Sequence, residues 1–127
     1  MLGKREPEKY GKKDFPTFLK ELQSLFPGIE FSTFQSNIEG EIVTEIQKAG
    51  FSLDAIIINP GGYSHTSVAI ADAIAMIPAP VIEVHLTNLL SREEFRHTSL
   101  SGGVCKGSIM GFGLDGYRLA VEALKNI

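Results

Sequence analysis

Apolar positions follow helical spacing in some segments of the chain and strand spacing in others. In residues 14–26 they recur every three or four positions, which places them on one face of a helix. Asp14 is a suitable N-cap for this helix, and Pro27 with Gly28 ends it. The predicted apolar stripe consists of Phe15, Phe18, Leu19, Leu22, Leu25 and Phe26.

Strands and helices are predicted to alternate along the rest of the chain. Strands are expected at residues 29–35, 55–58, 81–84 and 105–111, and the run at 55–58 is continuously apolar, as in strands covered on both faces. Helices are expected at residues 41–49, from 66 or 67 to 76, at 91–96 and at 114–125. Such alternation predicts a parallel α/β sheet with right-handed crossovers.

The first predicted helix has no strand before it, although folds of this class normally begin with a strand. It therefore has no crossover to complete. We expect either that a partner supplies the strand or that the sequence lacks its beginning.

Composition and charge restrict the class of protein. The chain has 127 residues, 43% of them hydrophobic and 21% charged, which fits one globular domain over residues 1–127. A formal net charge of −3 gives no reason to expect nucleic acid or an anionic membrane. No apolar run approaches the ~20 residues that cross a bilayer. Cys105 is the only cysteine and no signal peptide is recognised, so a cytoplasmic protein is predicted.

Polar residues follow two of the predicted strands, where open α/β sheets bind ligands. Asn59 and His65 belong to the segment after residues 55–58, and His85 follows residues 81–84. Glu83 lies two residues before His85, so both side chains point to the same face of the strand. A carboxylate there stabilises a protonated imidazole and makes it a proton donor. Arg96 is a candidate partner for a carboxylate.

These patterns also have plainer interpretations. A single histidine after a strand is more often a hydrogen-bonded structural residue, and Asn-Pro-Gly-Gly is first of all a turn sequence. The G-x-G-x-x-G pattern from Gly111 to Gly116 lacks the following strand and acidic residue of a dinucleotide site, so we interpret it as a tight turn with close packing. The histidines show no metal-ligand spacing. The residues alone thus indicate a small anionic ligand and acid–base chemistry.

Four motifs together resemble one known family, the type II 3-dehydroquinate dehydratases. Leu2-Gly-Lys-Arg-Glu-Pro-Glu8 with Tyr10-Gly11 resembles the catalytic lid, and Gln35-Ser-Asn-Ile-Glu-Gly-Glu41 resembles the second-strand loop. The signature is matched by Asn59-Pro-Gly-Gly-Tyr-Ser-His-Thr-Ser-Val-Ala-Ile70 with Asp72. Glu83-Val-His-Leu-Thr-Asn88 and Arg92-Glu-Glu-Phe-Arg96 complete the resemblance, which covers the chain from end to end.

The resemblance implies a flavodoxin-like fold of strand order 2-1-3-4-5 and a lyase that dehydrates 3-dehydroquinate to 3-dehydroshikimate through an enolate. It implies neither metal nor cofactor. Tyr10 would be the base, activated by Arg5, because a tyrosine normally titrates near pH ~10. His85 would be the general acid held by Glu83, and Asn59 would hold the enolate oxygen and a water.

The remaining implied residues bind the substrate or another subunit. His65, Arg96 and the backbone of Leu86 and Thr87 would hold the hydroxyls and the carboxylate. Asp72 would reach the site of a neighbouring subunit, in trimers that assemble into a dodecamer. The family's first strand, with its Asn-Gly-Pro-Asn-Leu-Asn loop, does not appear in this sequence. A catalytically impaired assembly or anion-binding module is therefore the alternative to the active enzyme.

Overall fold

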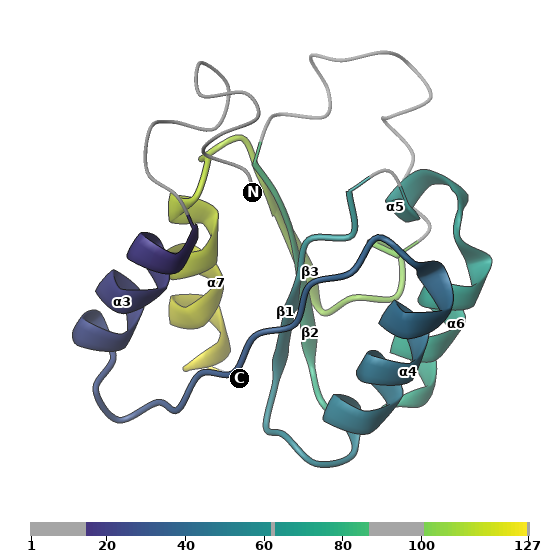
Figure 1. Cartoon of the computed structure of the whole chain (residues 1–127), viewed down its shortest axis with the longest axis horizontal. Coiled ribbons are helices and arrows are strands. Elements are labelled where there is room, and N and C mark those ends of the chain that lie inside the picture. Colours follow the sequence, from purple (N-terminus) through teal and green to yellow (C-terminus); the bar gives the residue numbers. More distant parts are fainter. Residues whose placement is uncertain (1–14, 62, 87–100, 127) are drawn as a thin grey trace.

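The described part of the chain is a parallel sheet covered by helices on both faces. The computed structural model describes residues 15–61, 63–86 and 101–126. Three strands, β1 (Ile56–Ile58), β2 (Val81–His85) and β3 (Gly107–Met110), lie in the order β1-β2-β3. The helices α3 (Phe15–Leu25) and α7 (Asp115–Leu124) cover one face, and α4 (Glu39–Gly50) and α6 (Val68–Met76) cover the other (Figure 1). This arrangement confirms the predicted α/β class.

The register of the sheet places β2 at its centre. On one side Ile58 pairs with Glu83, and on the other Glu83 pairs with Ser108 and His85 with Met110. All five residues of β2 are buried, whereas those of β1 are half-buried. The middle strand is therefore the element around which the described fold is built.

Two apolar cores lie on opposite faces of the sheet, because successive side chains of a strand point to opposite sides. Ile82 and Val84 pack with Ala120 of α7, and Leu86 continues this side into the core under α3. Val81 packs on the other face with a cluster from α4 and α6. That cluster contains Ile46, Ile70, Ala73, Ile74 and Ile77. Glu83 and His85 share the side of Val81.

Most predicted elements are confirmed with small shifts of their ends. The helices predicted at residues 41–49, 66–76 and 114–125 correspond to α4, α6 and α7. Ser67 is the N-cap of α6, since its side chain accepts a hydrogen bond from the Ile70 N–H at 3.0 Å. In the predicted stripe of α3, Phe18, Leu22 and Phe26 are buried, but Leu25 is 58% exposed. The helix predicted at 91–96 lies outside the described residues.

The prediction of a strand at residues 29–35 is wrong. The segment forms no strand, and most of it is exposed. A strand exists only if a neighbour completes its hydrogen-bond ladder. The expected order places another strand between this segment and β1, and none of the described residues provides one. A further difference is a short helix α5 (Tyr63–Thr66), within a segment expected to be a turn.

The glycines after β3 confirm the interpretation as a turn with close packing. Gly111 and Gly113 have φ of 93° and 58°, a region that favours glycine. Gly116 lies where α7 approaches β2, and an added Cβ there would meet Cγ1 of Val84 at 3.0 Å. The glycine pattern therefore serves the approach of helix to sheet.

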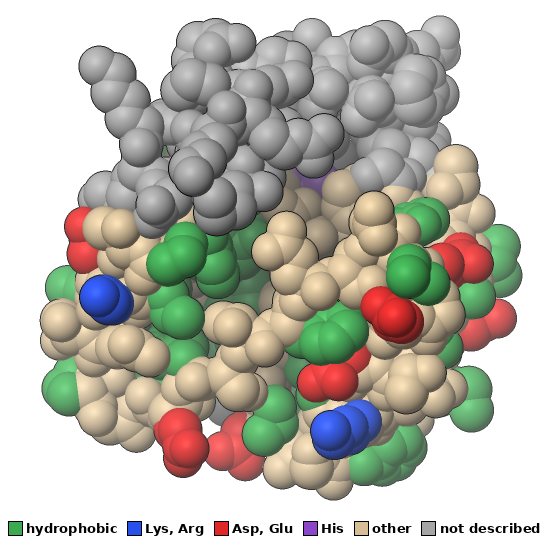
Figure 2. Space-filling model, in the orientation of Figure 1, with side chains coloured by type: hydrophobic (Ala, Val, Ile, Leu, Met, Phe, Trp, Pro, Cys, Tyr) green, Lys and Arg blue, Asp and Glu red, His purple; other side chains and the backbone are tan. Residues whose placement is uncertain are grey.

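The described part of the chain contains no helix long and apolar enough to cross a membrane. Acidic and basic side chains are scattered over the described surface facing the viewer in Figure 2 and form no patch of one sign.

Gly50 provides a test of how closely α4 packs against α6. A Cβ at Gly50 would lie 2.4 Å from Cβ of Ile77, whereas one at Gly40, in the same helix, would meet nothing within 4 Å. We expect Gly50→Ala to lower the free energy of unfolding by about 1–3 kcal/mol through overpacking. Gly40→Ala should leave it unchanged or raise it by up to ~1 kcal/mol. Urea unfolding of both variants measures this, and equal stabilities would contradict the close packing.

Candidate active site

The carboxyl end of β2 places Glu83 and His85 side by side on one face of the sheet. They are the third and fifth residues of the strand, so they follow Val81 on the side of α4 and α6. Glu83 is 1% exposed and His85 is 5% exposed. The sequence-based prediction that the two side chains share a face is thus consistent with the register, and both are buried.

The Glu83 carboxylate and the His85 ring are in ion-pair contact. Nε2 of His85 lies 3.2 Å from Oε2 of Glu83. Their angle does not complete a hydrogen bond, and Nε2 has no other partner among the described residues. The contact can therefore stabilise a protonated ring, the state in which an imidazole donates a proton.

A second group on the Glu83 carboxylate is one that the sequence analysis missed. Ser101, fully buried, donates its hydroxyl hydrogen bond to Oε1 of Glu83. The two residues are 18 positions apart. No local pattern identifies such a contact, because it forms only when the turn before β3 lies against β2.

Asn59 follows β1 and is fixed by its own turn and by α7. Its Oδ1 accepts a hydrogen bond from the Gly61 N–H at 3.2 Å, and Gly61 has a φ of 60°. A side-chain hydrogen bond joins Asn59 to the phenol of Tyr117. Burial raises the pKa of Tyr117 above its ordinary value, and this hydrogen bond offsets part of the rise. Tyr117 was not identified from the sequence, which gave no indication that α7 contributes to the site.

The other predicted site residues are only partly within the described structure. Leu86 is buried, and its carbonyl accepts a hydrogen bond from Gly113 N–H at 2.9 Å. Asp72 is exposed on α6. Outside the described part lie Arg5, Tyr10, Thr87, Arg96 and the side chain of His65.

Cys105 lies near the same carboxylate. Burial raises the pKa of its thiol to about 12, and the charge of Glu83 adds to the rise. The thiol is therefore neutral at physiological pH. Among residues 15–61, 63–86 and 101–126, no three His, Cys, Asp or Glu side chains are grouped so that they could hold a metal.

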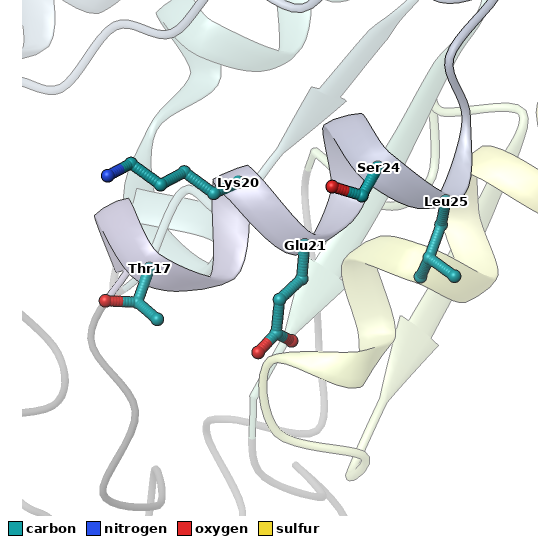
Figure 3. Close-up of a pocket in the computed structure, with 5 residues that line it drawn as sticks. All are labelled: Thr17, Lys20, Glu21, Ser24 and Leu25. Carbon is teal, nitrogen blue, oxygen red and sulfur yellow. The ribbon is translucent and has the colours of Figure 1, made fainter.

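A surface depression on α3 lies away from Glu83 and His85. It is lined by Thr17, Lys20, Glu21, Ser24 and Leu25. All five side chains come from one helix and point in different directions rather than toward a common point (Figure 3). Because a binding site needs convergent polar groups, we assign no function to this surface.

Comparison with known proteins agrees on one family. The model of the class II dehydroquinase family matches residues 1–125. The 3-dehydroquinate dehydratase of Lachnoclostridium phytofermentans is 54% identical over 127 residues, covering 98% of this chain and 88% of the relative. That of Helicobacter pylori strain Shi470 is 48% identical, covering 100% of this chain and 79% of the relative.

Solved structures give the same result. The type II dehydroquinase from Propionibacterium acnes superposes with a TM-score of 0.92 at 37% identity, covering 99% of this chain and 88% of that one. The enzyme from Butyrivibrio crossotus superposes with a TM-score of 0.91 at 43% identity, covering 98% and 88%. On the agreement of family model, sequence and fold, the chain belongs to the class II dehydroquinase family.

Proposed function

We propose that this chain is a hydro-lyase that converts 3-dehydroquinate to 3-dehydroshikimate on the route to chorismate. The observation that carries the proposal is the buried Glu83–His85 pair at the carboxyl end of the central strand. Its relatives at 48–54% identity bear the name 3-dehydroquinate dehydratase. A proton donor beside a carboxylate is what the departure of a hydroxyl group requires.

The proposed reaction is an anti elimination through an enolate. A base removes the proton at C2, and the electrons left behind move onto the neighbouring ketone oxygen. When the enolate collapses, the C–O bond to the C1 hydroxyl breaks, and the imidazolium of His85 supplies a proton so that water leaves. Glu83 stabilises that imidazolium by its charge. One proton is taken from carbon and one is given to oxygen, so the enzyme's net charge does not change. A proton passed from the base to the acid through solvent restores the starting state of both groups.

The base and the substrate-binding groups are proposals from the family resemblance. Tyr10 would take the C2 proton, with Arg5 stabilising its phenolate. Asn59 would donate to the enolate oxygen, and its hydrogen bonds to Gly61 and Tyr117 support a fixed orientation. The other proposed contacts to hydroxyls and carboxylate are His65, Arg96 and the backbone of Leu86 and Thr87.

A catalytically impaired binding or assembly module is the second candidate. Its supporting observation is β1, whose residues are only half-buried and which pairs with β2 alone among the described residues. An ultraviolet assay for the conjugated product separates the two candidates. Turnover of 3-dehydroquinate supports the enzyme, and binding of the substrate without turnover supports the module.

We also propose that the chain forms trimers assembled into a dodecamer, located in the cytoplasm. Val68, Asp72 and Met76 occupy positions i, i+4 and i+8 of α6, so they lie on one stripe of that helix. Val68 is 61% exposed and Met76 is 74% exposed. An exposed apolar stripe with an acidic residue at its centre suits contact with another subunit. The reduced Cys105 is consistent with a cytoplasmic enzyme.

Replacing the proposed acid tests the function directly. His85→Asn should lower kcat by about 10²–10⁴-fold, the usual contribution of general acid–base catalysis. The variant should retain the fold, since the residue sits at the end of its strand. Circular dichroism and the product assay measure both properties. A variant that keeps more than half of the parent's kcat would exclude His85 as the acid.

The proposed lid is tested by a double-mutant cycle. Arg5→Ala and Tyr10→Phe should each remove most of the turnover, and the double variant should lose far less than the product of the two effects, because both residues serve one phenolate. The kcat values of the four proteins give the coupling. Fully multiplicative losses would show that Arg5 acts independently of Tyr10.

The α6 stripe is tested by sedimentation velocity. Lysine at both Val68 and Met76 should shift the protein to a smaller species, because two charges would be buried at the contact. Leu25→Lys on α3, also exposed but on the other face of the sheet, is the matched control and should keep the parent's sedimentation coefficient. If the double lysine variant sediments as the parent does, the stripe is not an interface.

A further inference from the structure

The carboxylate of Glu83 is the most deeply buried charged group in the described part of the chain. It is 1% exposed in the central strand, and an ionised carboxylate without partners at such a place is strongly unfavourable. One partner, His85, belongs to the proposed chemistry. A second partner, Ser101, has no role in the reaction as described above.

Ser101 is fixed in place by the turn that it begins. Its carbonyl accepts hydrogen bonds from the N–H groups of Val104 at 3.1 Å and Cys105 at 3.2 Å. The Lys106 N–H then donates to the carbonyl of Val81 at 2.8 Å, which joins the turn to the start of β2. The hydroxyl of Ser101 is fully buried and donates to Oε1 of Glu83. Its position is therefore set by the backbone rather than by a mobile side chain.

We propose that Ser101 is a positioning residue for the dehydration, because its hydroxyl holds Glu83 ionised and directs the other carboxylate oxygen, Oε2, at His85. The inference rests on the proposed function only for its effect on turnover. The effect of Ser101 on the protonation of Glu83 does not depend on which substrate the protein binds.

The direction of the effect follows from which state the hydrogen bond favours. A hydroxyl that donates to a carboxylate stabilises the charged form, so removing it makes the carboxyl group take up a proton at higher pH. A protonated Glu83 no longer stabilises the imidazolium of His85. Glu83 therefore has to be ionised for the acid to function, so protonation of Glu83 lowers kcat at low pH in addition to protonation of the proposed base Tyr10.

Two other titratable residues of the described part lie on the same side of the sheet as the carboxylate. From the turn before β3, the thiol of Cys105 has a pKa raised to about 12 by burial and by Glu83, so it stays neutral across the assayed range. From α5, Tyr63 packs on the same core and donates its hydroxyl to the Asn37 carbonyl at 2.8 Å. His85 is the titratable group that the described residues bring into ion-pair contact with Glu83.

Ser101→Ala is the decisive variant, since it removes one oxygen and adds nothing. We expect kcat to fall by about tenfold, the effect of losing one hydrogen bond to a charged group, with KM changed less than about twofold. The pH midpoint at which Glu83 takes up a proton should rise by about one unit, which corresponds to the same tenfold. A purely structural role for Ser101 would leave that midpoint unmoved.

Two further variants serve as controls. One tests whether a general loss of stability changes the pH profile, and the other tests whether Ser101 acts through Glu83. Val121→Ala removes buried atoms from the core on the other face of the sheet, so it destabilises the fold without touching Glu83, and its pH profile should match the parent's. Glu83→Gln removes the charge on which Ser101 acts. Adding Ser101→Ala to Glu83→Gln should therefore cause less than about twofold further loss of kcat, because effects that pass through one group are not additive. A full additional tenfold loss would overturn the proposal.

Infrared spectroscopy provides a readout that does not depend on activity. The carbonyl band of protonated Glu83 is identified as the signal absent from Glu83→Gln, and its pH midpoint should rise by about one unit in Ser101→Ala. An unmoved midpoint overturns the inference whatever the kinetics show. A raised midpoint in a protein that does not dehydrate 3-dehydroquinate would retain the coupling and reject only the proposed function.

Discussion

The described structure has to accommodate one carboxyl group buried at the centre of its sheet. Glu83 belongs to the middle strand, and its side chain is only 1% exposed. Burying a charge is unfavourable by several kcal/mol unless it is paired and hydrogen-bonded. Here the pairing comes from β2 itself through His85 and from the turn before β3 through Ser101. The packing of β3 against β2 therefore also positions a hydrogen-bond donor for the site residue Glu83.

The alternation of side chains lets β2 serve the core and the site together. Ile82, Val84 and Leu86 point toward α3 and α7, where Gly116 allows α7 to approach Val84 closely. Glu83 and His85 point to the other face, above the apolar contacts of Val81. A shift of one residue in register would place the polar pair against α7 and turn the apolar set toward α4 and α6. The apolar face of the strand therefore fixes where the polar pair lies.

The success of sequence-based prediction varied with how local the determining interactions are. The α3, α4, α6 and α7 helices have apolar residues at helical spacing within their own sequences, and they were predicted with small errors at their ends. The relation of Glu83 to His85 was also local, because a spacing of two in a strand implies a shared face. Residues 29–35 have strand composition, but a strand requires a partner, and composition cannot provide one. Ser101 and Tyr117 were missed because their contacts join segments that are distant in the sequence.

The stereochemistry of the proposed reaction explains why its groups come from different parts of the chain. In an anti elimination the base and the acid act on opposite faces of the substrate, so one strand end cannot supply both. The acid needs a buried partner to remain charged, and the centre of a sheet offers that environment. A tyrosine base needs a cation and access to the opposite face, which a segment outside the sheet can provide. Assigning His85 to the sheet and Tyr10 with Arg5 to the segment before α3 satisfies both requirements. On this proposal the end of β2 stabilises the charged form of the acid, and the segment before α3 supplies the base for the opposite face of the substrate.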